Sequence, residues 1–158
     1  MAGEDETALE LLRRQSGLSV DLEGRLCHLG EPITHARTLE VLWGSLARQR
    51  DGRYLVTVGR ESGYVRLEDA PYGVRGVTFE RDQPELHLTD HSVEPLDPGT
   101  LWLDQDGVLH CLVKRGSHRA RFTRAAQIDL GLALDEDAQA PSGFALRLGE
   151  RTFPVGKA

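Results

Sequence analysis

Two segments of this 158-residue chain show the same order of features, which restricts the fold more than any other part of the sequence. In the first segment, Gly24 is followed eleven residues later by His35. In the second, Gly107 is followed eleven residues later by His118. Each histidine opens a stretch with the apolar spacing of a helix, which leads to an alternating strand between glycines. A hairpin–helix–hairpin unit cannot bury both its faces alone, so two copies are expected to pack together.

The predicted fold class is therefore α+β and β-rich, with two related hairpin–helix–hairpin half-domains packed on each other and a short N-terminal helix. The repeat predicts that residues 18–67 and 101–156 superpose, with the two histidines at equivalent helix starts. Thr34 and Ser117 are the expected N-caps of these helices. The expected organisation is an N-terminal helix over 1–17, a first half-domain with connecting strands over 18–99, and a second half-domain over 100–158.

Composition places the chain among globular proteins, at 39% hydrophobic and 28% charged residues. No apolar run approaches the roughly 18 residues needed to span a bilayer, and the acidic, amphipathic N-terminus does not resemble a signal peptide. We therefore expect a cytoplasmic protein without membrane contact. Only Cys27 and Cys111 are present, and both are expected to be reduced thiols in the core.

Residues 107–127 form an unusually basic stretch in a chain whose net charge is −6. The expected helix from Ser117 would place His118, Arg119 and Arg121 in its first turns, with Lys114 in the turn before it. Cations at a helix start oppose the helix dipole, so the arrangement suggests a nearby anion. The alternatives are internal ion pairs with Glu68, Asp69 or the acidic segment 80–106, a small anionic ligand or phosphorylated partner, and nucleic acid. Net charge and sparse aromatic residues argue against nucleic acid.

Metal binding and catalysis find little support in the sequence. His110 and Cys111 are neighbours in an expected strand, so their side chains point to opposite faces and cannot readily share one ion. His87 and His91 surround an expected strand end, not a helix that would place both on one face. No nucleophile elbow or phosphate-binding glycine loop occurs. The sequence therefore predicts no metal, no cofactor and no catalytic residue.

The best polar motif is "LEDAPY", in which Glu68 and Asp69 precede a turn at Ala70-Pro71. A carboxylate at this place can accept backbone N–H bonds and end a strand. The alternative is that Glu68 or Asp69 contacts a ligand beside Tyr72.

This motif also carries a resemblance. "PITHARTLEVLWGSLARQRDGRYLVTV", followed by "VRLEDAPYGV", resembles the bacterial domain-of-unknown-function family 1285 (DUF1285) over about residues 18–156. The matching patches are Asp51-Gly52, the strand ending at Thr57, and "LEDAPY"; after Thr57 the family usually continues Pro-Val-Glu, whereas this chain has "VGRE". The resemblance implies a repeated, β-rich α+β architecture and a link to bacterial signalling or ligand sensing.

The resulting hypothesis is a non-catalytic regulatory module with an anion-binding cleft between the two halves, for a small anionic ligand or a protein partner. The oligomeric state is not indicated. One alternative is an enzyme of unrecognised class, using Glu68, Asp69, His118 and Arg121. Another is a structural protein-interaction module that docks through its N-terminal helix. The expected ligand-binding residues are Lys114, Ser117, His118, Arg119, Arg121, Glu68, Asp69 and Tyr72.

Overall fold

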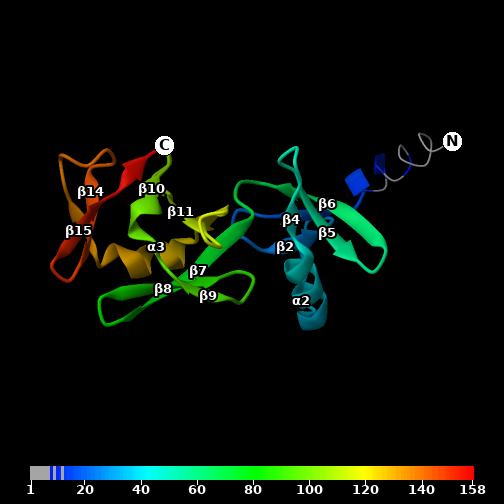
Figure 1. Cartoon of the computed structure of the whole chain (residues 1–158), viewed down its shortest axis with the longest axis horizontal. Coiled ribbons are helices and arrows are strands. Elements are labelled where there is room, and N and C mark those ends of the chain that lie inside the picture. Colours follow the sequence, from blue (N-terminus) through cyan, green and yellow to red (C-terminus); the bar gives the residue numbers. More distant parts are fainter. Residues whose placement is uncertain (1–7, 9, 12) are drawn as a thin grey trace. The chain divides into compact units, whose positions relative to one another are not determined.

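The computed structural model describes residues 8, 10–11 and 13–158 (Figure 1). Strands dominate this part of the chain and form three sheets, and the helices are short, so the α+β fold class is confirmed. The described residues of the N-terminal segment are helical at 8, 10–11 and 13–14, and the helix has ended by residues 15–17; residues 1–7, 9 and 12 of the predicted helix lie outside the described residues. None of the helices described here combines the length and apolar character needed to cross a bilayer.

The chain divides into two compact units. The first comprises residues up to 21 together with 25–69, and the second comprises 22–24 together with 70–158. The division between the two units differs from the expected boundary at 99/100. It lies near Asp69 because the strands that follow join the sheet of the second unit, where β7 (Tyr72–Glu80) pairs in parallel with β12 (His118–Phe122).

The first unit is one six-stranded sheet with a helix. The strand order is β3-β2-β1-β6-β5-β4, and β1 and β6 run parallel at its centre. The elements are β1 Leu18–Val20, β2 Leu26–His28, β3 Glu31–Pro32, α2 Ala36–Ser45, β4 Ala47–Arg48, β5 Tyr54–Val58 and β6 Glu61–Leu67. Alternate strand residues are buried, as expected for a sheet with one covered face. Leu42 and Trp43 of α2 are buried as well, and α2 packs on β5.

The second unit contains a seven-stranded sheet of order β16-β10-β11-β12-β7-β8-β9 and a three-stranded sheet of order β13-β14-β15. The remaining elements are β8 Gln83–Leu88, β9 Val93–Pro95, the 3-10 helix η1 Pro98–Thr100, β10 Trp102–Leu103, β11 Leu109–Val113, α3 Arg124–Gly131, β13 Leu134–Glu136, β14 Phe144–Leu148, β15 Arg151–Pro154 and β16 Gly156–Lys157. Helix α3 packs on β7 and buries Ala126 and Leu130.

A hydrogen-bonded frame of the first unit recurs in the second. In each, a strand is followed by a tight turn that a backbone hydrogen bond closes, between an aspartate and the residue four positions later. Asp21 N donates to Arg25 O, and Asp104 N donates to Val108 O, both at 3.0 Å. Each then returns a hairpin strand parallel to the opening strand, as β6 does beside β1 and β16 beside β10. The strands around β1 and around β10 therefore have the same local order.

The predicted equivalence of His35 and His118 is wrong. His35 is the N-cap of α2, where its Nδ1 accepts from Thr38 N at 3.3 Å, so Thr34 is not the cap. His118 begins strand β12. The equal spacing from Gly24 to His35 and from Gly107 to His118 therefore does not mark equivalent positions. The β2–β3 hairpin stops at Pro32, which has no N–H to donate, whereas the β11–β12 hairpin continues to Phe122.

Both cysteines are buried free thiols, Cys27 at 3% and Cys111 at 0% exposure. Burial, reinforced by the charges of Glu94 and Asp97, raises the pKa of Cys111 to about 12. Burial and the neighbouring Asp21 carboxylate raise the pKa of Cys27 as well. Since the thiolate is the reactive form, neither residue is set up as a nucleophile.

We expect neither thiol to react with iodoacetamide in the native protein at mildly alkaline pH, and both to react in concentrated urea. Mass spectrometry of the alkylated protein measures this directly. Rapid native labelling of Cys111 would contradict the buried, neutral thiol described here.

Candidate functional site

The basic stretch that the sequence placed at a helix start is a strand. His118, Arg119 and Arg121 all lie on β12, and the helix α3 begins only after Thr123, whose hydroxyl accepts from Ala126 N at 3.2 Å. Ser117 is the last residue of the β11–β12 turn and caps no helix. The predicted helix start at Ser117 is therefore wrong, and the argument for an anion drawn from the helix dipole at this place falls with it.

Strand geometry also separates the predicted site residues from one another. Successive side chains of a strand point to opposite faces, so His118 shares a face with the buried Ala120 and Phe122, and Arg119 shares the other face with Arg121. His118 lies against Tyr72 of β7, with ring centroids 5.5 Å apart. Arg121 lines a pocket of about 470 Å³ beside α3.

Lys114 is the centre of a compact polar cluster in the second unit. Its ammonium donates to Asp90 Oδ2 at 2.6 Å and to Ser92 Oγ at 2.9 Å, and it lies 5.3 Å from the centre of the Tyr72 ring. Its backbone N–H donates to Glu94 Oε1 at 2.9 Å. These acids come from the segment 80–106, so for Lys114 the structure favours internal ion pairing over an open anion site.

Asp90 is ionised within this cluster. Burial would raise its pKa, but hydrogen bonds from Lys114 and Ser92 outweigh that effect, and the pKa of Asp90 is lowered. A serine and a lysine at 2.9 Å can form a catalytic pair only when the amine is neutral. Here the lysine is bound to a carboxylate, so the cluster holds the β11–β12 turn to the β8–β9 turn and does not activate Ser92.

The two remaining predicted residues belong to the first unit. Glu68 and Asp69 follow β6 in a bend, and Glu68 N closes the sheet by donating to Val20 O at 3.0 Å. Glu68 is exposed and Asp69 is half-buried. Tyr72, by contrast, is buried in the second unit, at the first residue of β7.

A basic pocket that the sequence did not reveal lies in the first unit, with a volume of about 610 Å³. Three arginines and two tyrosines from three different segments line it, together with the turn glycines Gly17, Gly30 and Gly52. They are Arg14 at the end of the N-terminal helical residues, Arg53 just before β5 and Tyr54 at its start, and Tyr64 and Arg66 on β6. In the described part of the chain, Arg66 forms no ion pair, so its positive charge at the pocket is uncompensated.

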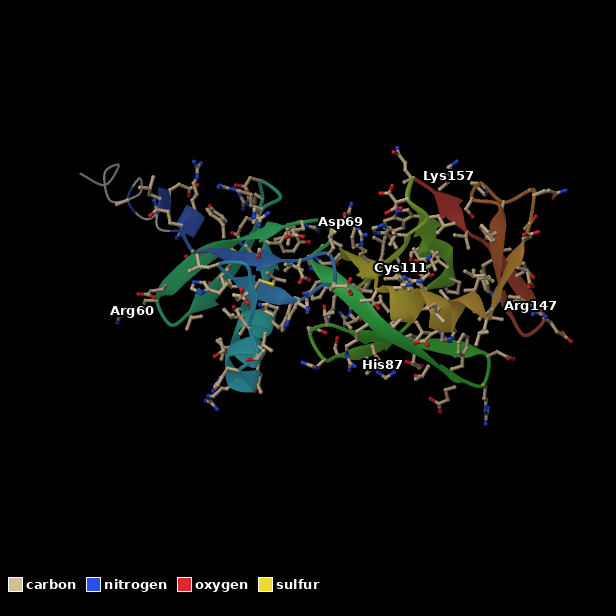
Figure 2. The ribbon with its side chains drawn as sticks, turned by 180° about the vertical axis from the view of Figure 1, so that it is seen from behind. Arg60, Asp69, His87, Cys111, Arg147 and Lys157 are labelled. Carbon is tan, nitrogen blue, oxygen red and sulfur yellow. The ribbon has the colours of Figure 1, made fainter. Side chains whose placement is uncertain are left out.

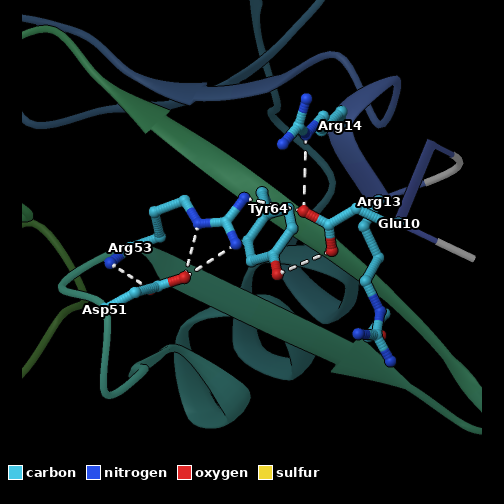
Figure 3. A network of polar contacts seen from close by, with 7 residues as sticks. Glu10, Arg13, Arg14, Asp51, Arg53 and Tyr64 are labelled. Atoms are coloured by element: carbon cyan, nitrogen blue, oxygen red, sulfur yellow. Dashed lines mark hydrogen bonds and ion pairs between the residues drawn. The ribbon is translucent and has the colours of Figure 1, made fainter. Parts of the chain in front are cut away.

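Arg53 is held in one orientation within this pocket (Figure 3). Asp51 accepts from its Nε at 2.8 Å and pairs with its Nη2 at 2.7 Å, while the guanidinium lies 3.9 Å from the centre of the Tyr64 ring. Asp51 also accepts from the backbone N–H of Arg53 at 3.0 Å, an Asx turn. The hydrogen bonds to Asp51 and then Glu10 raise the pKa of Arg53 above its ordinary value. The pairing of Asp51 with Arg53 could have been inferred from the turn sequence "RDGR". The contact between the Arg53 guanidinium and the Tyr64 ring could not, because Tyr64 lies on the next strand.

Two solved structures share this fold. A DUF1285 family protein from Silicibacter pomeroyi DSS-3 matches with a TM-score of 0.66 and 16% identity, over 89% of this chain and 79% of that one. A DUF1285 family protein from Shewanella baltica OS155 matches with a TM-score of 0.58 and 17% identity, over 74% of this chain and 91% of that one. The resemblance drawn from "LEDAPY" and its flanking strands is confirmed at the level of the fold.

No protein-family model matches the chain, and no curated protein matches it. The segment that departs from the family pattern after Thr57 is the β5–β6 turn, in which Val58 pairs with Glu61 across Gly59-Arg60. Gly59 has φ of 62°, which suits the tight two-residue connection that these strands use.

Proposed function

We propose that this chain is a non-catalytic binding module of the bacterial cytoplasm, with a regulatory role in signalling, and that its ligand is an anion held in the basic pocket of the first unit. The observation that carries the proposal is the grouping of Arg14, Arg53 and Arg66 around one pocket in a chain whose net charge is −6. A local excess of positive charge on an acidic protein attracts small anions selectively to that place.

The pocket has the chemistry that anion recognition requires. A guanidinium offers paired N–H donors to a carboxylate or phosphate, and tyrosine offers an apolar face with one hydroxyl. A volume of about 610 Å³ is in the range of small-molecule sites. The proposed site therefore moves from Lys114, whose charge Asp90 balances, to Arg66 and its neighbours.

The enzyme alternative used Glu68, Asp69, His118 and Arg121, and the geometry of β12 bears on two of these residues. It combined His118 with Arg121, but these residues are three apart in a strand and point to opposite faces. These two side chains therefore do not face one common site across the strand.

Arg66→Ala tests the proposal. Phosphate or citrate added at constant ionic strength should raise the melting temperature of the wild-type protein, because a ligand bound only by the folded state stabilises it by about 2.7 kcal/mol at a hundredfold excess over Kd. We expect Arg66→Ala to lose most of this rise while keeping the stability of the unliganded protein within about 0.5 kcal/mol. Differential scanning fluorimetry measures both quantities.

Arg60→Ala is the matched control. Arg60 is an equally exposed arginine of the same hairpin, but it lies in the β5–β6 turn and outside the basic pocket (Figure 2). It should respond to anions as the wild-type protein does. Equal loss of the response in both variants would indicate general charge screening and would reject the pocket as the site.

A further inference from the structure

The basic pocket already receives a carboxylate, and that carboxylate comes from the chain itself. Glu10, from the N-terminal helical residues, accepts from Arg53 Nη1 at 2.9 Å through Oε1 and from the Tyr64 hydroxyl at 3.1 Å through Oε2 (Figure 3). One oxygen is thus bound by the guanidinium and the other by the phenol. This is the pattern of a two-point carboxylate receptor.

Contacts with residues other than Glu10 orient the Arg53 guanidinium. Asp51 uses Nε and Nη2 of Arg53, and the Tyr64 ring supports the guanidinium plane, so Nη1 remains directed at the incoming carboxylate. Arg53 immediately precedes β5, where its carbonyl accepts from Gln49 N at 2.7 Å, and Tyr64 lies on β6, which pairs with β5. A group oriented in this way by other contacts loses little entropy when it binds a ligand.

Two polar contacts of described residues, besides those of Glu10 itself, attach the N-terminal segment, which carries Glu10, to the β5–β6 hairpin. Arg13 Nε donates to Ser62 Oγ at 2.9 Å, and Ser16 Oγ donates to Tyr64 O at 2.6 Å. The side chains of Glu10 and Arg53 are 33% and 43% exposed, and solvent screens an ion pair this open, so the pair holds Glu10 only weakly. A ligand with comparable contacts can therefore displace Glu10.

We propose that Glu10 occupies the place of a ligand carboxylate, so that the pocket recognises a carboxylate-bearing small molecule and the N-terminal segment competes with it. The inference rests on the proposed function and adds the ligand class and a regulatory contact. Arg53 and Tyr64 bind the ligand carboxylate, and Arg66 lies in the same pocket for a second acidic group. Release of Glu10 also frees Arg14, which pairs with Glu10 at 3.3 Å, and so raises the positive charge available to the ligand.

The test is isothermal titration of the full-length protein with citrate at neutral pH and constant ionic strength. Glu10→Ala removes the internal competitor and should bind citrate about tenfold more tightly than the wild-type protein, because a hydrogen-bonded charge no longer has to be displaced. Glu40→Ala removes an exposed acid on α2 and should bind as the wild-type protein does. In the Glu10→Ala background, Tyr64→Phe should weaken citrate binding several-fold, and Arg53→Gln should weaken it further. Circular dichroism and a thermal melt establish that each variant is folded.

Three results would overturn the inference. The first is equal citrate affinity in the wild-type protein and Glu10→Ala, which would show that Glu10 does not compete. The second is phosphate binding as tight as citrate binding in Glu10→Ala, which would reject carboxylate selectivity. The third is no citrate binding by Glu10→Ala at millimolar concentration. If Arg66-dependent stabilisation by anions persists in any of these cases, the proposed function stands and only the role of Glu10 fails; if it is absent, both fail.

Discussion

Replacing Gly24 with alanine should destabilise the protein by about 2–5 kcal/mol, whereas the same replacement at Gly107 should cost only about 1–2 kcal/mol. The two glycines occupy the same position in the recurring turn and have nearly the same backbone, with φ of 78° and 77°. Both substitutions therefore carry the same cost of a left-handed residue with a side chain. They differ in what the new Cβ would meet.

At Gly24 the added Cβ would lie 2.5 Å from Gly73 Cα and 2.9 Å from Thr89 Cγ2, whereas at Gly107 nothing lies within 4 Å. Gly73 cannot move aside easily, because its N–H donates to Thr89 Oγ1 and its carbonyl accepts from Thr89 N, both at 2.9 Å. The clash is thus with hydrogen-bonded backbone, which is costly to displace.

Urea unfolding of the two variants beside the wild-type protein measures the difference. Gly107→Ala serves as the control for backbone strain, so the excess loss in Gly24→Ala reports the close packing alone. Equal losses in the two variants would show that Gly24 and Gly73 do not approach this closely in solution.

The strands of this fold were largely predictable because their signals are local. Alternation of apolar residues over Tyr54–Val58 and Phe144–Leu148, with glycine turns after them, predicted two hairpins that the structure contains. The resemblance in "LEDAPY" predicted the fold shared with the two DUF1285 structures, although it reveals no activity.

Strand β12 was missed although its alternation is visible in retrospect. Ala120 and Phe122 are buried between exposed or half-buried neighbours, and Gly116 with φ of 78° helps form the turn before them. The same residues also fit a helical spacing that continues into α3. These residues form a strand and not a helix because they pair in parallel with β7. Since β7 lies far away in the sequence, this pairing leaves no local signal.

The site was less predictable than the fold for the same reason. One alternative was internal pairing of the basic segment with the acidic segment, and Lys114 does pair with an acid of that segment, Asp90. The sequence could not identify Asp90 as the partner, because the contact depends on two turns that lie close together only in the fold. The basic pocket depends on contacts between residues as far apart as Glu10 and Tyr64. Arginines scattered over three segments do not resemble a site until the sheet brings them together.

The Asp90–Lys114 pair should couple by about 1.5–3 kcal/mol in a double-mutant cycle of Asp90→Ala and Lys114→Met at neutral pH. Its side chains are only 12% and 29% exposed and lie 2.6 Å apart, so solvent screens them weakly. Arg147 and Asp135 form the control pair, in the same unit and at 2.9 Å, but 57% and 54% exposed. That pair should couple by about 0.2–1 kcal/mol, because open ion pairs are screened and lose side-chain entropy. Methionine keeps an unbranched aliphatic side chain at position 114, so the cycle chiefly reports the loss of the charge.

The coupling should also depend on pH with a definite sign. Hydrogen bonds in the folded state lower the pKa of Asp90, against the opposing effect of burial, so the unfolded chain takes up a proton more readily than the folded one. The stabilisation is therefore fully present above the unfolded carboxyl pKa of about 4, and it is lost as the pH falls through the lower pKa of the folded state. Urea unfolding across this range should show the wild-type advantage over Lys114→Met shrinking only below about pH 4. A coupling no larger than that of the Arg147–Asp135 pair, or one that persists after Asp90 is protonated, would show that Lys114 is not held by this carboxylate. The basic turn would then again be open to an external anion.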